Sequence, residues 1–586
     1  MAHAIILGAM ADSPRNETIR SFRNSPDDFL AEALGGFVAA HPDAEWNEAG
    51  FIGRSSAIVT DSGSPAVAVI SGGGSGHEPM HAGFIGAGML AAACPGHMFT
   101  SPNAVQVTEA TRWADQGAGV LHIVKNYTGD VMNFQVARQS LPDVETRAVV
   151  VADDVATDID SGSDGPGRRG TGATILVEKV AGAAAARGDS LDAVTEIATF
   201  VAENSRSMAV ALAPGHLPTS GRDTFDLPEG QMEVGVGIHG ERGVSRETLA
   251  DAGSLCGRLV EEVTEALGAK SGEDFVCLVN GLGGTTNLEL NLVFGQVLRE
   301  LGQRGIHVRH SLVGSFVTSV NMAGVSLTLT RATDKVVELL DADTDAPAWP
   351  RVLGGEAEFA PARIAFDDSL SSEQEMKGGS ENVWLSDFVE RVQGATNDLT
   401  ELDRLAGDGD FGANMDAAFG EIELPLHGSD ATVLAALSHR MLVRAGGTSG
   451  AVFGTLFREL GEAAQSITDA LGSGLSATAF AAGLEKAVSA VMDLGGASEG
   501  DNTLVDALAP AARAAREAAS DDRSFDEVLT ASYEAARDGA LATTEMVATK
   551  GRASYLGDAS KGVPDPGAIV VAWLFGGSGR TADFAG

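Results

Sequence analysis

The segment AVAVISGGGSGHEP, residues 66–79, is the clearest indication of how the first half of the chain folds. Small and β-branched residues at 66–70 are typical of a buried strand, and a run of glycines follows at 72–74. Glycines at a strand end let a ligand approach the backbone, and ligands bind at that edge of an open α/β sheet. The segment therefore predicts a buried strand that leads into a ligand-binding loop, although a tight strand-to-helix turn gives the same pattern. It carries neither GxxxxGK[ST] nor GxGxxG, so no nucleotide is implied here.

Strand-like and helix-like segments alternate over the first 340 residues. Apolar runs at 119–127 and 147–155 end in polar residues, and helix-like segments cover 171–188 and 190–207. The order strand, helix, strand returns at 274–284, 288–305 and 306–316. This alternation predicts an α/β architecture, divided into two units.

The pattern changes after residue 340. Residues 341–381 are polar and rich in Pro, Gly and Ser, which is typical of a linker. From residue 382 to 586 the apolar residues follow a helical period and strand-like runs nearly vanish. We expect an all-helical second domain.

The amino-acid composition limits the kinds of partner that this chain is expected to bind. The chain has 586 residues, too many for one core, and a formal net charge of −41, which argues against nucleic acid or an anionic membrane. It does not exclude a small phosphate ligand. Three widely spaced cysteines (Cys94, Cys256 and Cys277), no signal-peptide pattern and no apolar stretch long enough for a membrane span predict a cytoplasmic protein.

Two motifs of the first half carry residues suited to chemistry. IVKNYTGDVMNF (123–134) places Lys125 and Asp130 around a turn, where Lys can donate to a substrate oxygen and Asp can accept a proton. VGVGIHGERG (234–243) places His239 at a strand end between glycines, open to a ligand, and a neutral imidazole is a nucleophile. Taken alone, each is also compatible with an ordinary solvated or structural residue.

The helical half carries a cluster of acids in LTELDRLAGDGDFGANM (399–415). Asp403, Asp408 and Asp410 repel one another unless cations lie between them, and oxygen ligands suit Mg²⁺ shared with phosphates. The spacing excludes an EF-hand, and the loop opens a helix whose first N–H groups suit phosphate. A polar capped turn is the alternative. RAGGTSGAVFG (444–454) and GRASYLGDASKGVPDPGA (551–568) add weaker loops of the same kind.

Together these motifs resemble the dihydroxyacetone kinase family. GGGSGHEP, VKNYTGDVMNF, GVGIHGERG, LDRLAGDGDFGANM, GGTSG and GRASYLG…DPGA stand in the family's order over about residues 30–586. The resemblance is to the single-chain, ATP-dependent form. It implies a ketone-binding half with two α/β subdomains (about 1–205 and 206–340), the linker 341–381 and an all-α Mg-ATP-binding domain (382–586) built as an eight-helix barrel.

The resemblance also implies the reaction. His239 would hold the ketone as a covalent hemiaminal, which a polyol such as glycerol cannot form, while His77 and Asp130 would assist proton transfer from the terminal hydroxyl. The expected product is dihydroxyacetone phosphate, and we expect a homodimer. The ketone would be lined by Gly74, Ser75, Gly76, His77, Lys125 and Asp130. Two Mg²⁺ ions would lie on Asp403, Asp408 and Asp410. The nucleotide would be bound by Phe411, Gly412, Ala413, Asn414, Thr448, Ser449, Gly450, Arg552, Asp565, Pro566 and Gly567.

Three segments depart from the family pattern. MAVALAPGHLPTSG (208–221) brings His216 into a loop that can border the ketone, which makes a four-carbon substrate such as erythrulose an alternative. Asn502 stands where the family often has a basic residue, and residues 1–28 have no counterpart. The same motifs are also compatible with a phosphocarrier-dependent kinase, a ketone sensor without turnover, or an FAD-cleaving side activity.

Overall fold

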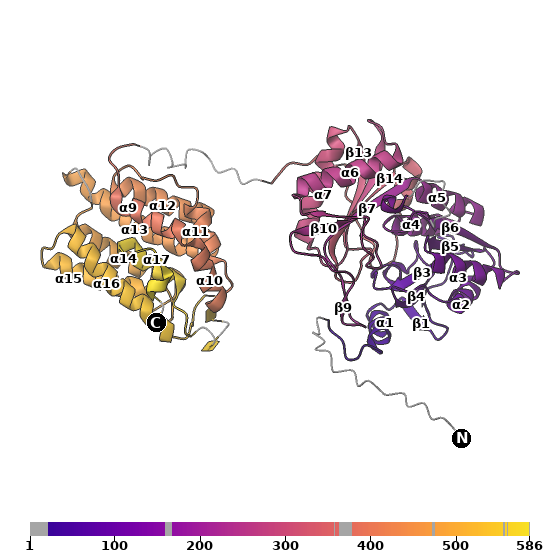
Figure 1. Cartoon of the computed structure of the whole chain (residues 1–586), viewed down its shortest axis with the longest axis horizontal. Coiled ribbons are helices and arrows are strands. Elements are labelled where there is room, and N and C mark those ends of the chain that lie inside the picture. Colours follow the sequence, from indigo (N-terminus) through magenta and orange to yellow (C-terminus); the bar gives the residue numbers. More distant parts are fainter. Residues whose placement is uncertain are drawn as a thin grey trace, which may run out of the picture. The chain divides into compact units, whose positions relative to one another are not determined.

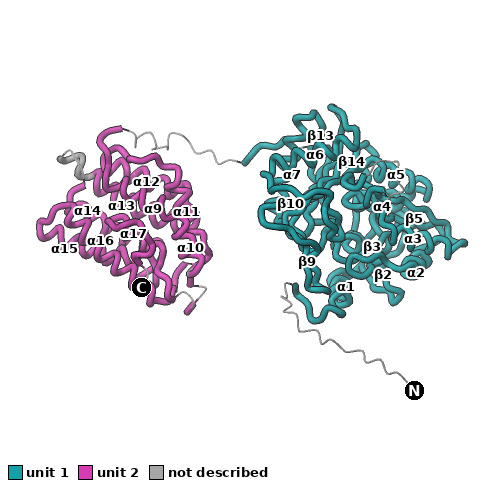
Figure 2. The backbone as a smooth tube through the Cα atoms, in the orientation of Figure 1, with its two compact units in different colours: residues 1–362 teal, residues 363–586 magenta. Residues whose placement is uncertain are grey.

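The computed structural model divides the chain into two compact units, residues 1–362 and 363–586 (Figure 2). It describes residues 21–158, 167–356, 358–362, 378–471, 475–551, 553–554, 557–558 and 561–584. An α/β first unit and a helical second unit are as the sequence predicts. In this described part of the chain, no helix is long and apolar enough to cross a membrane.

The first sheet of unit 1 has six strands in the order β1-β2-β4-β3-β5-β6 (Figure 1). The strands are β1 (Ala44–Asn47), β2 (Phe51–Arg54), β3 (Ala68–Ser75), β4 (Ala92–Met98), β5 (Val120–Lys125) and β6 (Thr146–Val151). β3 is central, parallel to β4 and β5, and every residue of it is buried. Apolar residues bury both faces of the sheet, as a parallel sheet requires. Helices α2 (Ala104–Ala114) and α3 (Thr128–Gln139) contact it, as do α4 (Ala173–Arg187) and α5 (Leu191–Glu203).

The second sheet of unit 1 follows the order β11-β10-β7-β14-β12-β13, in which only the pair β12–β13 is parallel. Its strands are β7 (Ser205–Ala213), β10 (Gln231–Val234), β11 (Ser245–Thr248), β12 (Asp274–Gly281), β13 (His307–Gly314) and β14 (Ala323–Arg331). Helices α6 (Ala252–Leu267) and α7 (Asn287–Gln303) pack on it, and α8 (Asp334–Asp341) packs on α4. The remaining elements are α1 (Phe29–Ala40) and the hairpin of β8 (His216–Leu217) and β9 (Arg222–Asp223).

Three expectations need correction at their boundaries. The helix expected over 190–207 ends at Glu203, because Ser205 and Ser207 pair with β14 in the sheet. The segment 208–221, expected as a loop, begins inside β7. β10 ends at Val234, so His239 lies in a turn beyond the strand rather than at its end.

The linker also begins later than residue 341. The Asp345 N–H donates to the Ala87 carbonyl at 3.0 Å, and Trp349 is buried with its ring edge-on to Phe84. Gly354 bridges to Ser311 of β13. Burial of Trp349 removes a large apolar surface from water, which holds this polar stretch against unit 1.

Unit 2 contains nine α-helices and no β-strand among its described residues. They are α9 (Val383–Gly394), α10 (Thr396–Ala406), α11 (Phe411–Phe419), α12 (Asp430–Arg444), α13 (Gly447–Leu471), α14 (Ala477–Gly495), α15 (Val505–Ser520), α16 (Phe525–Ala542) and α17 (Pro566–Phe575). Every residue of α17 is buried, and this helix contacts α9, α10, α15 and α16 (Figure 1). Asp565 caps its first turn and Pro566 opens it, an N-terminal signal that the sequence carries plainly. Whether eight of the helices close a barrel stays a prediction.

Candidate active sites

His77 is fully buried after the glycines of β3. Its Nδ1 lies 2.9 Å from the Thr318 carbonyl, so Nδ1 carries the proton and donates it. Its Nε2 is buried without a hydrogen-bond partner among the described residues. Burial, with the nearby His239 and Lys125, holds the pKa of His77 well below its usual range. His77 therefore presents a neutral nitrogen with a free lone pair.

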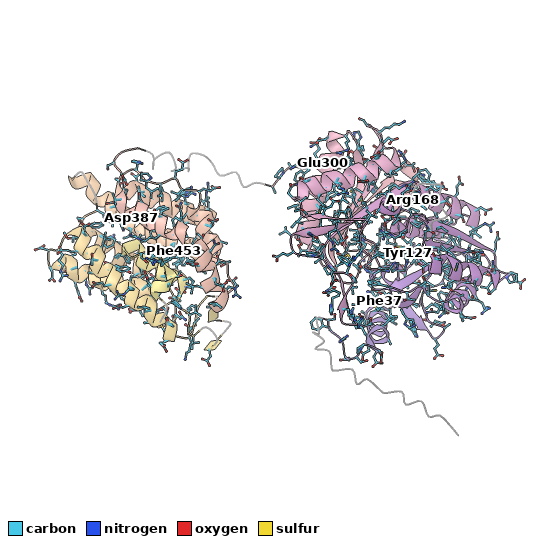
Figure 3. All side chains as sticks on the ribbon, viewed as in Figure 1. Phe37, Tyr127, Arg168, Glu300, Asp387 and Phe453 are labelled. Atoms are coloured by element: carbon cyan, nitrogen blue, oxygen red, sulfur yellow. The ribbon has the colours of Figure 1, made fainter. Side chains whose placement is uncertain are left out.

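Aromatic rings enclose His239. The ring centroid of His77 lies 4.7 Å from that of His239, and those of Tyr127 and Phe99 lie at 4.3 and 5.8 Å. Tyr127 lies near the middle of unit 1 (Figure 3). Glu241 accepts a hydrogen bond from the His239 backbone N–H at 2.9 Å, and its other oxygen lies 3.6 Å from Nδ1. The imidazole is thus fixed in orientation, with its side chain only 15% exposed.

Lys125, at the end of β5, is buried with three polar neighbours. Its ammonium donates to the Gly72 carbonyl at 3.1 Å and to His81 Nε2 at 2.8 Å, and it lies 3.7 Å from Asp130 Oδ2. Burial lowers the pKa of Lys125, while the charges of Asp130 and Glu178 raise it. The other oxygen of Asp130, Oδ1, is buried and has no hydrogen-bond partner among the described residues.

The glycines of β3 make room for this cluster. A Cβ on Gly73 would lie 2.0 Å from Lys125 Nζ, and one on Gly74 would lie 2.6 Å from backbone atoms of Phe99 and Thr100. Gly76 has a φ of +104°, in the region that favours glycine. The glycine run that predicted a ligand loop therefore leaves room for the Lys125 side chain and for the loop 97–100.

The predicted residues of unit 1 come together around two histidines. His77, Lys125, Asp130 and His239 form one connected group of side chains. Ser75 differs, because its hydroxyl already donates to the Gly96 carbonyl at 2.7 Å. A larger cavity of about 630 Å³ opens beside Ser75, between α1 and the loop after β3, but His77, Lys125, Asp130 and His239 do not line it. The predicted catalytic residues therefore lie together in the enclosed histidine group and not in this cavity.

The three predicted metal-binding residues of unit 2 also meet. Asp403 lies on α10, and Asp408 and Asp410 lie in the turn before α11; one carboxylate oxygen from each lies within 4.8 Å of the others. Asp403 also accepts a hydrogen bond from the Phe411 N–H at 3.1 Å. Burial raises the pKa of Asp403, and the charges of Asp408 and Asp410 raise it further. Three hard oxygen donors at this spacing fit Mg²⁺.

A pocket of about 190 Å³ adjoins these carboxylates. Of the predicted nucleotide residues, those that line it are Phe411, Thr448, Ser449, Asp565, Pro566 and Gly567. Its apolar wall includes Val452, Val491 and Phe453, the last labelled inside unit 2 in Figure 3. Burial raises the pKa of Asp565 to about 7, and the charges of Asp506 and Asp403 add to the rise.

Other predicted nucleotide residues do not line this pocket. A Cβ on Gly412 would lie 2.1 Å from Thr400 Oγ1, so this glycine serves the contact of α11 with α10. Asn414 accepts a hydrogen bond from the Gly446 N–H at 3.0 Å. Ala413 and Gly450 are not among the lining residues, and Arg552 lies outside the described residues.

Sequence reasoning missed several neighbours of both sites. His81 stands four residues after His77, and Glu178 and Lys179 interrupt the mainly apolar stretch ATILVEKVAGAAAA of α4. A charge inside an apolar helix was the signal available for Glu178. In unit 2, no sequence signal pointed to Lys550, which lines the pocket. Asn502, where the sequence departs from the family pattern, lines the pocket too and has a positive φ of 58°.

An enclosed histidine group in an α/β unit and a carboxylate triad beside a pocket in a helical unit are the arrangement of one class of protein, a two-part phosphotransferase. A Dak1 domain matches residues 35–348 and a DAK2 domain matches residues 405–578. The chain belongs to the dihydroxyacetone kinase family.

Named relatives extend over nearly the whole chain. The triokinase/FMN cyclase of Rattus norvegicus is 36% identical over 574 residues, covering 94% of this chain and 97% of that protein. The L-erythrulose 1-kinase of Mycolicibacterium smegmatis is 35% identical over 571 residues, with the same coverage of 94% and 97%.

A solved structure shares the architecture. The crystal structure of the dihydroxyacetone kinase of C. freundii gives a TM-score of 0.61 at 30% identity, covering 95% of this chain and 98% of that one. Its complex with AMP-PNP and Mg²⁺ gives a TM-score of 0.60 at 29% identity, with the same coverage.

Proposed function

We propose that this chain is an ATP-dependent kinase that phosphorylates the terminal hydroxyl of a short-chain ketose, held as a covalent hemiaminal on His239. The observation that carries the proposal is the enclosed group of His239, His77 and Lys125 in unit 1. Unit 2 supplies the complementary chemistry through its three carboxylates.

The surroundings of His239 suit attack on a carbonyl carbon. Because Nδ1 faces Glu241, Nε2 is the nitrogen available to bond the ketone carbon. As the Nε2–C bond forms, the carbonyl π bond breaks, which leaves negative charge on the ketose oxygen and positive charge on the ring. The Glu241 carboxylate, 3.6 Å from Nδ1, would stabilise the positive charge. Glycerol has no carbonyl, so this step separates a ketose from a polyol.

Two groups can take the proton of the reacting hydroxyl. His77 is neutral and its Nε2 has no partner among the described residues, and Asp130 Oδ1 is in the same condition. A base must lie within hydrogen-bond reach of the proton that it removes, and both groups belong to the cluster around Lys125. The Lys125 ammonium would donate to a substrate oxygen.

In unit 2, Asp403, Asp408 and Asp410 would hold two Mg²⁺ ions. When bound, Mg²⁺ neutralises phosphate charge, which is the main requirement of phosphoryl transfer. Thr448, Ser449 and the Asp565–Gly567 turn would contact the nucleotide, together with Gly412, Ala413, Asn414, Gly450 and Arg552. The proposal includes an eight-helix barrel around α17 and a homodimer.

Dihydroxyacetone is the first candidate substrate, and erythrulose is the second. Thr224, directly after the β8–β9 hairpin, lies against the turn that carries His239, because a Cβ on Gly240 would meet it at 2.5 Å. His216 of this hairpin is buried and lies 2.8 Å from Asp223 Oδ1. A relative carries the name L-erythrulose 1-kinase, and another is a triokinase/FMN cyclase. The FAD-cleaving side activity is therefore part of the proposal, to be tested with FAD and Mn²⁺.

The test is ADP release by the purified chain with Mg-ATP and dihydroxyacetone, D- or L-erythrulose, D-glyceraldehyde or glycerol. We expect turnover with at least one ketose and none with glycerol. Turnover with glycerol would contradict the hemiaminal step. Ketose binding without turnover would instead support the sensor, or the phosphocarrier-dependent kinase if added phosphocarrier protein restores turnover.

A further inference from the structure

We infer that His81 and Glu178 are a positioning pair that holds the Lys125 ammonium in the ketone site and sets its protonation. The inference rests on the proposed function, because it assigns Lys125 to the ketose. It concerns two buried residues that are 97 positions apart in the chain.

The contacts form one continuous line of hydrogen bonds. Lys125 Nζ lies 2.8 Å from His81 Nε2, and His81 Nδ1 lies 2.5 Å from Glu178 Oε1. Since the ammonium donates to Nε2, the ring carries its proton on Nδ1 and donates it to the carboxylate. Two of the three ammonium hydrogens are thereby assigned, one to His81 and one to the Gly72 carbonyl, and the third remains for Asp130 or a substrate oxygen.

A purely structural role does not account for Glu178. Residues 173–185 of α4 are all buried, and a carboxylate there is costly unless it is fully paired. The neighbouring Lys179 donates to the Leu339 and Ala342 carbonyls, which explains its presence. Against the effect of burial, the nearby Ser71 hydroxyl lowers the pKa of Glu178, but this hydroxyl donates to the Ile123 carbonyl at 2.9 Å, and Glu178 Oε2 has no hydrogen-bond partner among the described residues. The contact of its other oxygen with His81 leads to the lysine of the site.

Several ionisable groups surround the line of hydrogen bonds from Lys125 to Glu178. Lys125 is influenced by Asp130 of α3, Glu178 of α4 and the two histidines that follow β3, His77 and His81. Burial raises the pKa of Glu178 to about 8, and burial lowers that of Lys125, so the two values approach each other.

A proton can therefore pass along the line. When the Nζ–H bond breaks and an Nε2–H bond forms, the Nδ1–H bond breaks and an Oε1–H bond forms. Lysine and glutamate then become neutral together, and the imidazole ends neutral as it began.

The experiment compares Glu178→Gln and His81→Gln with two matched controls. His122→Gln changes an equally buried histidine on the same strand as Lys125, β5, and Glu233→Gln changes a buried glutamate of β10 that pairs with Arg246. Among the described residues, neither control contacts the line from Lys125 to Glu178. The full chain is measured in two ways: kcat/KM for dihydroxyacetone with Mg-ATP, and dihydroxyacetone affinity without ATP, each from pH 6 to pH 10.

For Glu178→Gln we expect the alkaline limb of both profiles to move to lower pH by about one unit, because the ammonium loses a carboxylate that favours its charged form. For His81→Gln we expect KM to rise roughly tenfold or more with a smaller change in kcat. The two control variants should leave the alkaline limb of each profile at the same pH as in the unaltered chain.

An unmoved alkaline limb in Glu178→Gln and an unchanged KM in His81→Gln, with losses of stability like those of the controls, would overturn the inference. If the unaltered chain phosphorylates no ketose, the proposed function fails, and the ATP-free affinity profile still decides on the pair. If Glu178→Gln does not fold, His81→Gln carries the same test.

Discussion

The two sites of this protein are built on opposite principles. In unit 1, the side chains around Lys125 are buried, oriented by hydrogen bonds and balanced in charge without any ligand. In unit 2, three carboxylates of the same charge lie within 4.8 Å of one another, and Asp408 is exposed. The first site is preorganised, while the second needs cations to stabilise it.

This difference indicates which kind of substitution should impair each site. A preorganised site depends on packing, so a small change of volume next to it should disturb it. A carboxylate site depends on its charges, so removal of one charge should matter more than volume. Substitutions in each site test this contrast.

Asp408→Asn should lower ketose phosphorylation about a thousandfold or more, because one ligand of the cation and its charge are lost. Ketose binding, measured by calorimetry without nucleotide, should be unchanged. Asp416→Asn, an exposed acid on the neighbouring helix α11, is the control. Equal ATP affinity in the Asp408 variant and the unaltered chain would refute its role.

His239→Ala should reduce kcat/KM for the ketose by about a hundredfold or more, since covalent capture and positioning of the carbonyl are lost. Mg-ATP affinity should remain. A crystal structure of the unaltered chain with dihydroxyacetone is the direct measurement, and a ketose with no bond to His239 would contradict the proposal.

Gly73→Ala should destabilise unit 1 by about 1–3 kcal/mol and weaken ketose binding, because the new methyl group would overlap the Lys125 ammonium at 2.0 Å. Urea unfolding of the full chain measures it. Gly35→Ala, within α1 and with no atom within 4 Å of its Cβ position, should instead stabilise by about 0.5–1 kcal/mol. Normal ketose affinity in the Gly73 variant would show that the site is less rigid than we argue.

Low pH should destabilise unit 1 through protonation of the buried His122. Burial lowers the pKa of His122 to about 3, and its Nδ1 is buried with no hydrogen-bond partner among the described residues. A lowered pKa means that stability is present above the ordinary value of 6.5 and is lost as the pH falls toward 3. In His122→Phe, the loss of unfolding free energy at acid pH should be smaller by about 1–2 kcal/mol.

Unit 2 provides the internal comparison for this measurement. Its buried Asp565 has a pKa that burial raises to about 7, so this group should make unit 2 gain stability as the pH falls from 7 to 4. Thermal unfolding from pH 7 to pH 4 measures both transitions. An identical acid response in His122→Phe and the unaltered chain would rule out this cause.

Local sequence patterns predicted much of the fold, because they report burial and periodicity. The runs at 66–74, 119–127 and 147–155 contain β3, β5 and β6 with small shifts at their ends. The helix predicted over 190–207 extended too far, since Ser205 and Ser207 are held by partners on β14 more than 100 residues away. Pairing across such a distance leaves no trace in helical periodicity.

The candidate sites were less predictable for the same reason. The Asp triad was visible because its members are close in sequence, whereas the contact of His81 with Glu178 joins distant segments. Glycines also mislead, because one residue type serves several purposes. Gly73 makes room for a lysine of the site, but Gly412 makes room for Thr400 between two helices.

The place that Gly73 leaves for the Lys125 ammonium has a consequence for engineering. A protein designer who wishes to change the ketose accepted by this chain gains nothing from varying Gly73, because a side chain at this position overlaps the Lys125 ammonium. The β8–β9 hairpin is the better target, since Arg222 and Asp223 are exposed and Thr224 reaches the glycine beside His239. A library limited to residues 216–224 would alter substrate range while leaving the reactive groups untouched.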